Sequence, residues 1–279
     1  MSNYLRRRLH FLLKHKAFKK NPIQIVFRLI LLTIIIIFKI KKNFKGAFGK
    51  ENFLFYLSPY KEKIGGRGYF LYREKQEPIL EFGAKLLNKN DIIIDAGANQ
   101  GIFTLSFRSK IGPNGKIIAI EPFQECIDIL KTNLKKNKFK NIKIYQRVLS
   151  NCVKNYEIDF THGITSASII KASKSTCKMP VKSITIDKIV YDNNLNKLNF
   201  IKLDIEGAEY LALLGGLKSI KKFKPLIYFE CYKLIEYIKI KELMKKIGYR
   251  IYSFNKEGNF EVSKKFERNN NNLILKYAE

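Results

Sequence analysis

Cysteine and histidine are scarce in this 279-residue sequence, with four and three residues respectively. The cysteines are dispersed and form no C-x-x-C pair, which argues against a zinc site or a disulfide scaffold and fits a reducing compartment. The histidines are too scattered for a His-rich metal site. The chemistry of the chain must therefore be sought among other side chains.

Acidic residues and arginine are also scarce. Lys and Arg number 53 against 24 Asp and Glu, which gives a formal net charge of +29, yet only ten of the bases are arginines. Proteins that read nucleic acid by sequence usually depend on arginine, so a nucleic-acid partner is disfavoured. Two explanations of the lysine excess stay open. It is either a compositional bias shared with the abundant Ile and Asn, or a basic surface for anionic lipid or glycan.

A long hydrophobic run is missing as well. The uninterrupted apolar stretch covers residues 29–38, too short to span a bilayer core of ~30 Å at ~1.5 Å per residue. Arg28 precedes it, and lysines rather than a small-residue cleavage site follow it, which argues against a signal peptide. Three interpretations remain: a helix packed on the rest of the chain, an interfacial helix held by lysines against anionic lipid, or a true span. We expect a cytoplasmic protein, either free or held at the cytoplasmic membrane through residues 1–45.

The chain divides by composition into three parts. Residues 1–50 form a basic and apolar helical extension, and residues 51–89 form a lead-in with short strands, a turn at 65–68 and a helix at about 76–88. From residue 90 to residue 279, apolar runs alternate with segments of helical periodicity. The expected strands are 91–97, 115–122, 141–149, 197–205, 224–231, 249–255 and 273–277. This alternation predicts an α/β fold, a Rossmann-like and mostly parallel sheet with helices on both faces.

Parallel sheets of this kind bind ligands outside the carboxyl ends of their strands, where the strand order reverses. The site is therefore expected to draw on four segments that follow strands: 95–101, 121–123, 148–152 and 204–209. The polar and short-stranded region 151–196 interrupts the alternation and is expected to overhang this edge.

The first strand of the main domain ends in the sequence IIIDAGANQG, residues 92–101. Its glycines, Gly97 and Gly101, follow a G-x-x-x-G spacing, which is neither the dinucleotide G-x-G-x-x-G nor a Walker sequence. The pattern favours a nucleoside ligand without a pyrophosphate, and Glu121 at the end of the next strand can accept both hydroxyls of a ribose. S-adenosylmethionine fits these features. The residues predicted to bind it are Asp95, Gly97, Ala98, Asn99, Gly101, Glu121 and Pro122. The alternative is an ordinary tight turn whose glycines serve geometry alone.

Three carboxylates gather in FIKLDIEGAEYL, residues 200–211, where a strand turns into a helix. Asp204 and Glu206 are candidates for a general base acting on an acceptor hydroxyl, or for ligands of a divalent cation that lowers the pKa of that hydroxyl. Glu209 is assigned to substrate binding, although an acid in the first helical turn is also favoured by the helix dipole. Lys202 is assigned to substrate binding too; alternatively it keeps Asp204 ionised.

The irregular region offers a further base candidate, His162, which would overhang the cleft. The hydroxyls of Thr165, Ser166 and Ser168 could bind a polar acceptor. Glu230, which closes the strand 224–231, either lines the acceptor side or bonds within the sheet.

With these motifs in hand, residues 90–231 resemble the FkbM-type methyltransferases, through DAGANQGIFTL with IAIEP and then SITIDKI, FIKLDIEGAEYLALLGG and KPLIYFE. The resemblance implies a class I fold that uses S-adenosylmethionine, with O-methylation largely of sugar and polyketide-type hydroxyls. It places Asp95, Gly97, Asn99, Gly101 and Glu121 around the cofactor. It places Asp204 with Glu206 near the point of methyl transfer.

The expected function is O-methylation of a hydroxyl on a glycan, glycolipid or similar small polyhydroxylated acceptor. Amino-group methylation of bases usually goes with an N/D-P-P-aromatic tetrapeptide, and this chain has DIEG at that place. Two alternatives remain, an RNA ribose methyltransferase and a non-catalytic membrane-surface protein that retains the cofactor fold.

Overall fold

The structure is a computed structural model of the chain. It describes residues 10, 12–40, 44–48, 53–57, 66–72, 79–80, 86–161, 163–169, 177–255, 259–263, 265–267 and 271–278.

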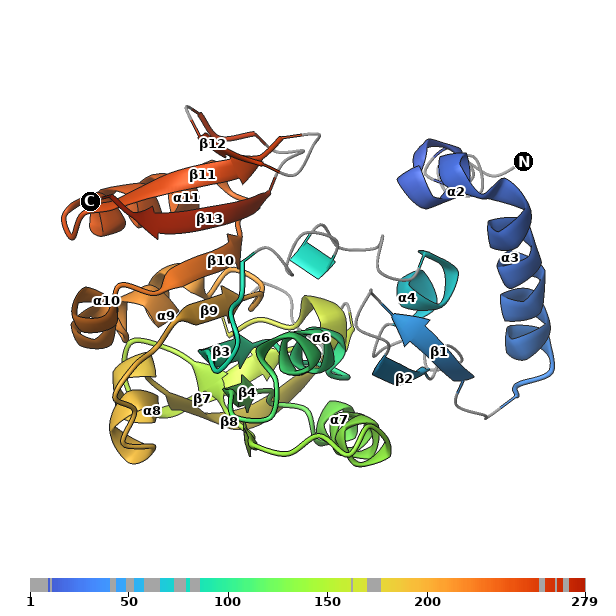
Figure 1. Ribbon diagram of the computed structural model, residues 1–279, viewed down its shortest axis with the longest axis horizontal. Coiled ribbons are helices and arrows are strands. Elements are labelled where there is room, and N and C mark those ends of the chain that lie inside the picture. Colours follow the sequence, from blue (N-terminus) through green and yellow to red (C-terminus); the bar gives the residue numbers. More distant parts are fainter. Residues whose placement is uncertain are drawn as a thin grey trace.

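An eight-stranded sheet forms the centre of the molecule (Figure 1), in the order β12-β11-β13-β10-β9-β3-β4-β5. The strands are β3 (Ile92–Ala96), β4 (Lys116–Ile120), β5 (Ile142–Tyr145), β9 (Phe200–Leu203), β10 (Leu226–Glu230), β11 (Tyr249–Phe254), β12 (Phe260–Val262) and β13 (Asn272–Tyr277). The five strands from β5 to β10 are parallel, and β13 is antiparallel to both of its neighbours. The predicted α/β class is therefore confirmed.

Alternation along the strands divides the core into two layers. Ile93, Ile117 and Phe200 belong to one buried cluster, which includes residues of α6 (Ile102–Ile111) and α7 (Gln124–Lys136). Their neighbours Ile94 and Ile118 belong to the opposite cluster. The helices of that second layer are α8 (Ile186–Asp192), α9 (Glu209–Leu214), α10 (Leu217–Phe223) and α11 (Leu234–Lys245). Both faces of the sheet are thus covered, which explains why these strands read as continuous apolar runs.

The strand order reverses at β3, which has β4 on one side and β9 on the other. The turns that follow these three strands therefore lie at one edge of the sheet, on either side of the reversal. This arrangement brings the segment after residue 96, the segment after residue 120 and the segment after residue 203 together.

Two predicted elements are divided in the structure. The strand expected over 141–149 leaves the main sheet after Tyr145, because Val148–Leu149 (β6) pairs with β8 (Lys178–Ile184) instead. Strand β8 also pairs with β7 (Asn155–Asp159), so the polar region builds a small sheet of its own. The helix expected over 208–220 is interrupted at Gly215, where an added Cβ would lie 2.2 Å from the carbonyl oxygen of Ser150.

The N-terminal part packs beside α6 and α7 (Figure 1). Its strands β1 (Phe44–Phe48) and β2 (Phe53–Leu57) pair antiparallel across the expected boundary after residue 50. The turn expected at 65–68 instead leads directly into a helix, α4 (Arg67–Tyr72), since Gly66 has a positive φ and its carbonyl accepts the first helical bond from Phe70. Most of the helix expected at about 76–88 lies outside the described residues.

The apolar segment before residue 40 forms α3 (Pro22–Ile37), preceded by α2 (Lys16–Lys20). Pro22 occupies the first helical turn, where its missing N–H costs nothing. One face of α3 is buried through Ile25, Leu32 and Ile35, so the interpretation as a helix packed on the rest of the chain is confirmed. Among the helices described, none is both long and apolar enough to cross a bilayer.

Candidate active site

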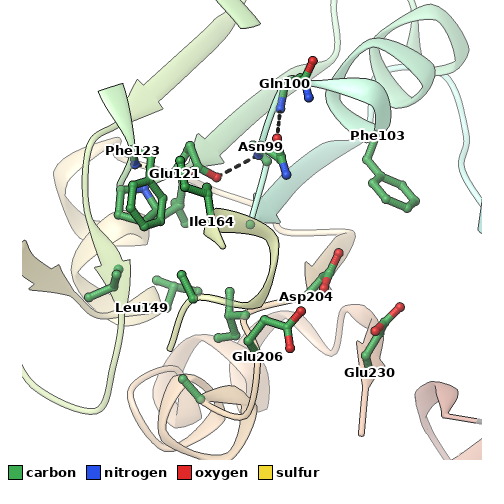
Figure 2. Close-up of a pocket in the computed structure, with 18 of the residues that line it drawn as sticks. Asn99, Gln100, Phe103, Glu121, Phe123, Leu149, Ile164, Asp204, Glu206 and Glu230 are labelled. Carbon is green, nitrogen blue, oxygen red and sulfur yellow. Dashed lines mark hydrogen bonds between the residues drawn. The ribbon is translucent and has the colours of Figure 1, made fainter. Parts of the chain in front are cut away.

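A cavity of about 360 Å³ lies at the carboxyl ends of β3, β4, β9 and β10. This volume is within the range typical of small-molecule sites. Figure 2 shows two groups of polar side chains facing it from opposite sides, Glu121 with Asn99 on one side and Asp204, Glu206 and Glu230 on the other. The lining also includes the apolar residues Phe103, Ile120, Phe123, Val148, Leu149, Ile158, Ile164, Ala167 and Ile169.

The turn after β3 is shaped by three residues with positive φ: Gly97, Asn99 and Gly101. Asn99 tolerates this conformation because its short amide bonds locally, and its Oδ1 accepts from the backbone N–H of Gln100 at 2.7 Å. An added Cβ at Gly101 would lie 2.3 Å from Cδ1 of Leu130 in α7. Gly101 therefore serves the approach of two helices, whereas Gly97 lines the cavity.

Glu121 closes β4 and is held by two backbone donors. Its Oε2 accepts from the N–H of Asn99 at 2.8 Å, and its Oε1 accepts from the N–H of Phe123 at 3.0 Å. Burial raises the pKa of Glu121 to about 7, although these two hydrogen bonds oppose the shift. The carboxylate is fixed in direction, and each oxygen keeps a lone pair for a ligand hydroxyl.

The apolar side of the cavity lies next to Glu121. Phe123 packs edge-on against Phe160 with ring centroids 5.7 Å apart, and Leu149 and Ile164 face the same space (Figure 2). An apolar slot beside a hydroxyl-accepting carboxylate suits a nucleoside, because the base stacks on apolar surface while the ribose bonds to the acid.

The acidic side of the cavity comes from the ends of β9 and β10. Glu206 has φ 53°, a conformation that non-glycine residues rarely adopt, and Gly207 follows it with φ 94°. Such strain is found mainly where a side chain must be aimed at a site. Asp204, Glu206 and Glu230 all reach the cavity lining. Three like charges therefore meet at one end of a cleft in a strongly basic protein.

The two glutamates of this group titrate near neutrality. Burial, with the charges of Asp204 and Glu230, raises the pKa of Glu206 to about 7. Burial and the charge of Asp204 likewise raise the pKa of Glu230 to about 7, against a hydrogen bond from the Tyr232 hydroxyl. A carboxylate with such a pKa can accept a proton effectively at physiological pH.

Lys202 lies next to Asp204, and its side chain is fully buried. Its Nζ is 3.2 Å from Oδ2 of Asp204 and 3.5 Å from Oδ1 of Asp95, and it donates to the carbonyls of Ala96 and Gly97. Burial disfavours the charged form, but the two carboxylates outweigh it and raise the pKa of Lys202. The ammonium thus stays charged and links the end of β3 to the end of β9.

The structure places the predicted cofactor residues in two groups. Gly97, Ala98, Asn99, Glu121 and Pro122 line the cavity. Asp95 is instead completely buried, where it accepts from the Thr104 hydroxyl at 2.6 Å and pairs with Lys202. Burial raises the pKa of Asp95, and Lys202 opposes that shift. Asp95 therefore stabilises the turn after β3 without facing the cavity, and the same holds for Gly101.

The residues predicted to bind substrate need the same correction. Lys202 has no exposed side-chain surface, so it positions Asp204 and cannot reach an acceptor. Glu209 is 2% exposed and turns back, so that its Oε1 accepts from the N–H of Ile205 at 3.0 Å. Burial and the nearby Glu236 raise the pKa of Glu209 well above its ordinary value. Glu209 thus holds the turn that carries Asp204 and Glu206 through this hydrogen bond, and it lies in the first turn of α9, the position that the alternative interpretation relied on.

The overhanging region contributes apolar side chains. Ile164, Ala167 and Ile169 line the cavity, whereas Ser166 is exposed and Ser168 forms a backbone bridge with Asp159. His162 and the side chain of Thr165 lie outside the described residues. Sequence reasoning overlooked this apolar cover because it searched the region for polar groups.

Other lining residues were also missed. Phe103 and Arg147 both line the cavity. Phe103 could have been found from the sequence, because it is an aromatic residue in the first turn of the helix that follows the glycine motif. Arg147 lies directly before the short strand β6. Tyr69 comes from α4, far away in sequence, and no local signal could have placed it at the cavity. Across the part of the chain that the structure describes, no group of three or more His, Cys, Asp or Glu residues could hold a metal ion, so the alternative of a divalent cation at Asp204 and Glu206 finds no support.

Comparison with known proteins gives consistent results. The sequence model of the methyltransferase FkbM domain matches residues 95–251. The protein "Methyltransferase sdnD" of Sordaria araneosa is 28% identical over 160 residues, which cover 46% of this chain and 61% of that protein. "Methyltransferase 1" of Beauveria bassiana is 26% identical over 148 residues, covering 45% and 58%.

Among solved structures, a methyltransferase FkbM from Methylobacillus flagellatus KT matches 75% of this chain and 52% of its own, with 17% identity and a TM-score of 0.49. The matches to these three proteins thus span about half to three fifths of their length.

Proposed function

The chain belongs to the FkbM family of S-adenosylmethionine-dependent methyltransferases, and we propose that it transfers a methyl group to a hydroxyl of a glycan, glycolipid or similar small polyhydroxylated acceptor. The observation that carries the proposal is the division of the cleft. One buried carboxylate faces the apolar slot, and three carboxylates face the opposite end.

The end of the cleft with the apolar slot has the groups that suit the cofactor. S-adenosylmethionine, when bound, supplies an electrophilic methyl group on a cationic sulfonium. Glu121 offers fixed acceptors for the ribose hydroxyls, and Phe123 with Leu149 and Ile164 offers apolar surface for the base. The acidic far side of the cleft would tolerate a cation.

The acidic end has the groups that a hydroxyl acceptor requires. A hydroxyl is a weak nucleophile until its proton is partly removed, and a positioned base supplies about 10²–10⁴-fold acceleration. Asp204 is our choice for this base, because Lys202 holds it in place at 3.2 Å. Glu206 and Glu230 accept further hydrogen bonds from the acceptor and share the proton that Asp204 removes.

The negative charge of the acidic end also bears on the chemical class of the acceptor. Three carboxylates repel phosphate groups, so an RNA acceptor would bring its backbone against like charge. Neutral polyols suffer no such penalty, and each of their hydroxyls can donate to a carboxylate. This reasoning supports a sugar-like acceptor over a ribose within RNA.

The test has two steps. Mass spectrometry of the purified protein should detect co-bound S-adenosylmethionine or S-adenosylhomocysteine, and calorimetry should measure binding of the latter. Labelled-methyl transfer to glycan, glycolipid and RNA fractions of the host then identifies the acceptor. Cofactor binding with label only in RNA would refute the acceptor class, and the absence of cofactor binding would refute the enzyme itself.

A further inference from the structure

Helix α3 is fixed to the enzyme along one face. Ile25, Leu32 and Ile35 are at most 5% exposed, and the guanidinium of Arg28 donates to the carbonyl of Leu71 in α4 at 2.9 Å. Helix α4 in turn contributes Tyr69 and Gly68 to the lining of the active-site cavity. α3 is therefore packed onto the catalytic unit, with α4 between it and the central sheet (Figure 1).

The opposite face of α3 is apolar and exposed. Ile23, Phe27, Ile30, Ile34 and Ile37 follow one another at alternating spacings of four and three residues, which places them in one stripe along the helix. Ile23 is 83% exposed, Phe27 67% and Ile37 66%. A continuous stripe of large apolar side chains on a protein surface marks an interaction site rather than ordinary scatter.

The charge around this stripe identifies the partner. Residues 1–50 contain thirteen Lys and Arg residues and no Asp or Glu, although acids are present throughout the rest of the chain. Lys19 and Lys20 precede α3 and Lys39 follows it, so cations stand at both ends of the stripe. Long lysine side chains can extend from such positions to the headgroups of a bilayer while the apolar face enters it.

A second copy of the chain fits this surface less well. Packing two α3 helices face to face would bring two segments that contain only positive charge together, with no acid in either to pair with. Anionic lipid supplies the opposite charge and an apolar interior in one partner.

We propose that α3 docks the enzyme on an anionic bilayer, lying in the interface plane with Ile23, Phe27, Ile30, Ile34 and Ile37 in the acyl region. This goes beyond the proposed reaction and does not depend on it. Of the three interpretations of this segment, packing on the enzyme and interfacial binding then apply together, to opposite faces of one helix.

The absence of tryptophan from the chain gives a direct test. Phe27→Trp places a single reporter on the stripe, and Ile235→Trp places the matched control on α11, where the native side chain is similarly exposed at 65%. With vesicles of phosphatidylcholine containing about 30% phosphatidylglycerol, Phe27→Trp emission should shift to the blue and Ile235→Trp emission should not. Pure phosphatidylcholine vesicles should give a much weaker response.

A sedimentation assay with the full-length chain completes the test. Ile30→Ser with Ile34→Ser should lower vesicle binding by at least about tenfold, since two apolar contacts are lost. The control pair Ile235→Ser with Ile238→Ser should bind like the wild type. Raising the salt from about 0.1 M to about 1 M should also weaken binding, because screening removes the lysine contribution.

Two results would overturn the proposal. In one, Phe27→Trp emission does not respond to anionic vesicles while calorimetry shows that the protein is folded and binds S-adenosylhomocysteine. In the other, ultracentrifugation finds a dimer that Ile30→Ser with Ile34→Ser dissociates, which would assign the stripe to a second copy.

Discussion

The two ends of the cleft both present carboxylates, but the neighbours of these carboxylates differ. Glu121 is fixed by two backbone N–H groups, whereas Asp204 is held by one buried ammonium and faces Glu206 and Glu230. Rigid neutral donors suit a group that binds a ligand in its ionised form. A cluster of like charges suits groups that exchange a proton. On the proposed function, this difference gives one residue type two roles within one cavity.

The strongest effect is expected at the acidic end of the cleft, where Asp204 is the proposed base. Asp204→Asn should reduce methyl transfer by about 10²–10⁴-fold, because the amide cannot take a proton from the acceptor. Binding of S-adenosylhomocysteine, measured by calorimetry, should change by less than about threefold, since Asp204 lies at the other end of the cleft.

The matched control is Asp128→Asn on the exposed side of α7, which should leave both activity and affinity unchanged. Full activity in Asp204→Asn would exclude this carboxylate as the base and would turn attention to Glu206 and Glu230.

The next effect concerns Lys202, the buried ammonium that pairs with Asp95 and Asp204. Lys202→Met should destabilise the protein by about 3–5 kcal/mol, because it leaves the buried Asp95 without its cation. Denaturant unfolding would measure the loss. The double variant Lys202→Met with Asp95→Asn should recover a substantial part of it, since no buried charge then remains between the strands. Equal stability of the single and double variants would contradict this pairing.

A smaller effect is expected at the binding end. Glu121→Gln turns one acceptor oxygen into a donor that opposes a backbone N–H, and should weaken S-adenosylhomocysteine binding by roughly tenfold or more. Because the pKa of Glu121 is about 7, wild-type affinity should decrease as the pH falls below that value, and Glu121→Gln should not show the decrease. A pH-independent wild-type affinity would show that Glu121 does not face the ligand.

The pH dependence of turnover tests the roles of Glu206 and Glu230. With saturating cofactor, kcat should rise through pH 7 as Glu206 and Glu230 lose protons. Glu230→Gln removes a negative charge that raises the pKa of Glu206, so the inflection should move to lower pH. An unshifted profile would mean that neither glutamate controls the step.

The smallest effect is on stability. The pKa of Glu206 is raised above its ordinary value of 4.5 to about 7, so its contribution to stability is full below pH 4.5 and is lost as the pH rises through 7. Glu206→Gln should therefore raise Tm at pH 8, by at most about 2–4 °C, and should leave it nearly unchanged at pH 4.5. Glu157→Gln, in an exposed ion pair, should have no effect at either pH.

Much of the fold could be predicted from the sequence, because buried parallel strands and amphipathic helices leave local periodic signals. The failures share a cause in long-range contacts. Strand β6 leaves the main sheet to pair with β8, more than thirty residues later, and Gly215 interrupts its helix because the Ser150 carbonyl occupies the space beside it. Neither partner can be identified from the residues around the break.

The candidate site shows the same division. The four segments expected at the carboxyl edge do converge on one cavity. The positions of 95–101, 121–123 and 204–209 follow from the strand order, whereas Val148 and Leu149 reach the cavity from the small sheet. The depth of each side chain did not follow from sequence. Nothing in the sequence distinguishes Lys202 and Glu209 from the many exposed lysines and glutamates of the chain. Both are nevertheless buried, because helices and strands pack around them. Tyr69 reaches the cavity only because the N-terminal part folds beside α6.

The contact between Gly97 and the end of β9 has one more consequence. An added Cβ at Gly97 would lie 1.9 Å from the carbonyl oxygen of Asp204, so the turn of the nucleoside half and the turn of the catalytic half touch with no space between them. On the proposed assignment of the two turns, this contact fixes the distance between the methyl donor and the base. The size of the acceptor would then depend on the outer walls of the cavity, to which Ile164, Ala167, Ile169 and the α4 residue Tyr69 contribute.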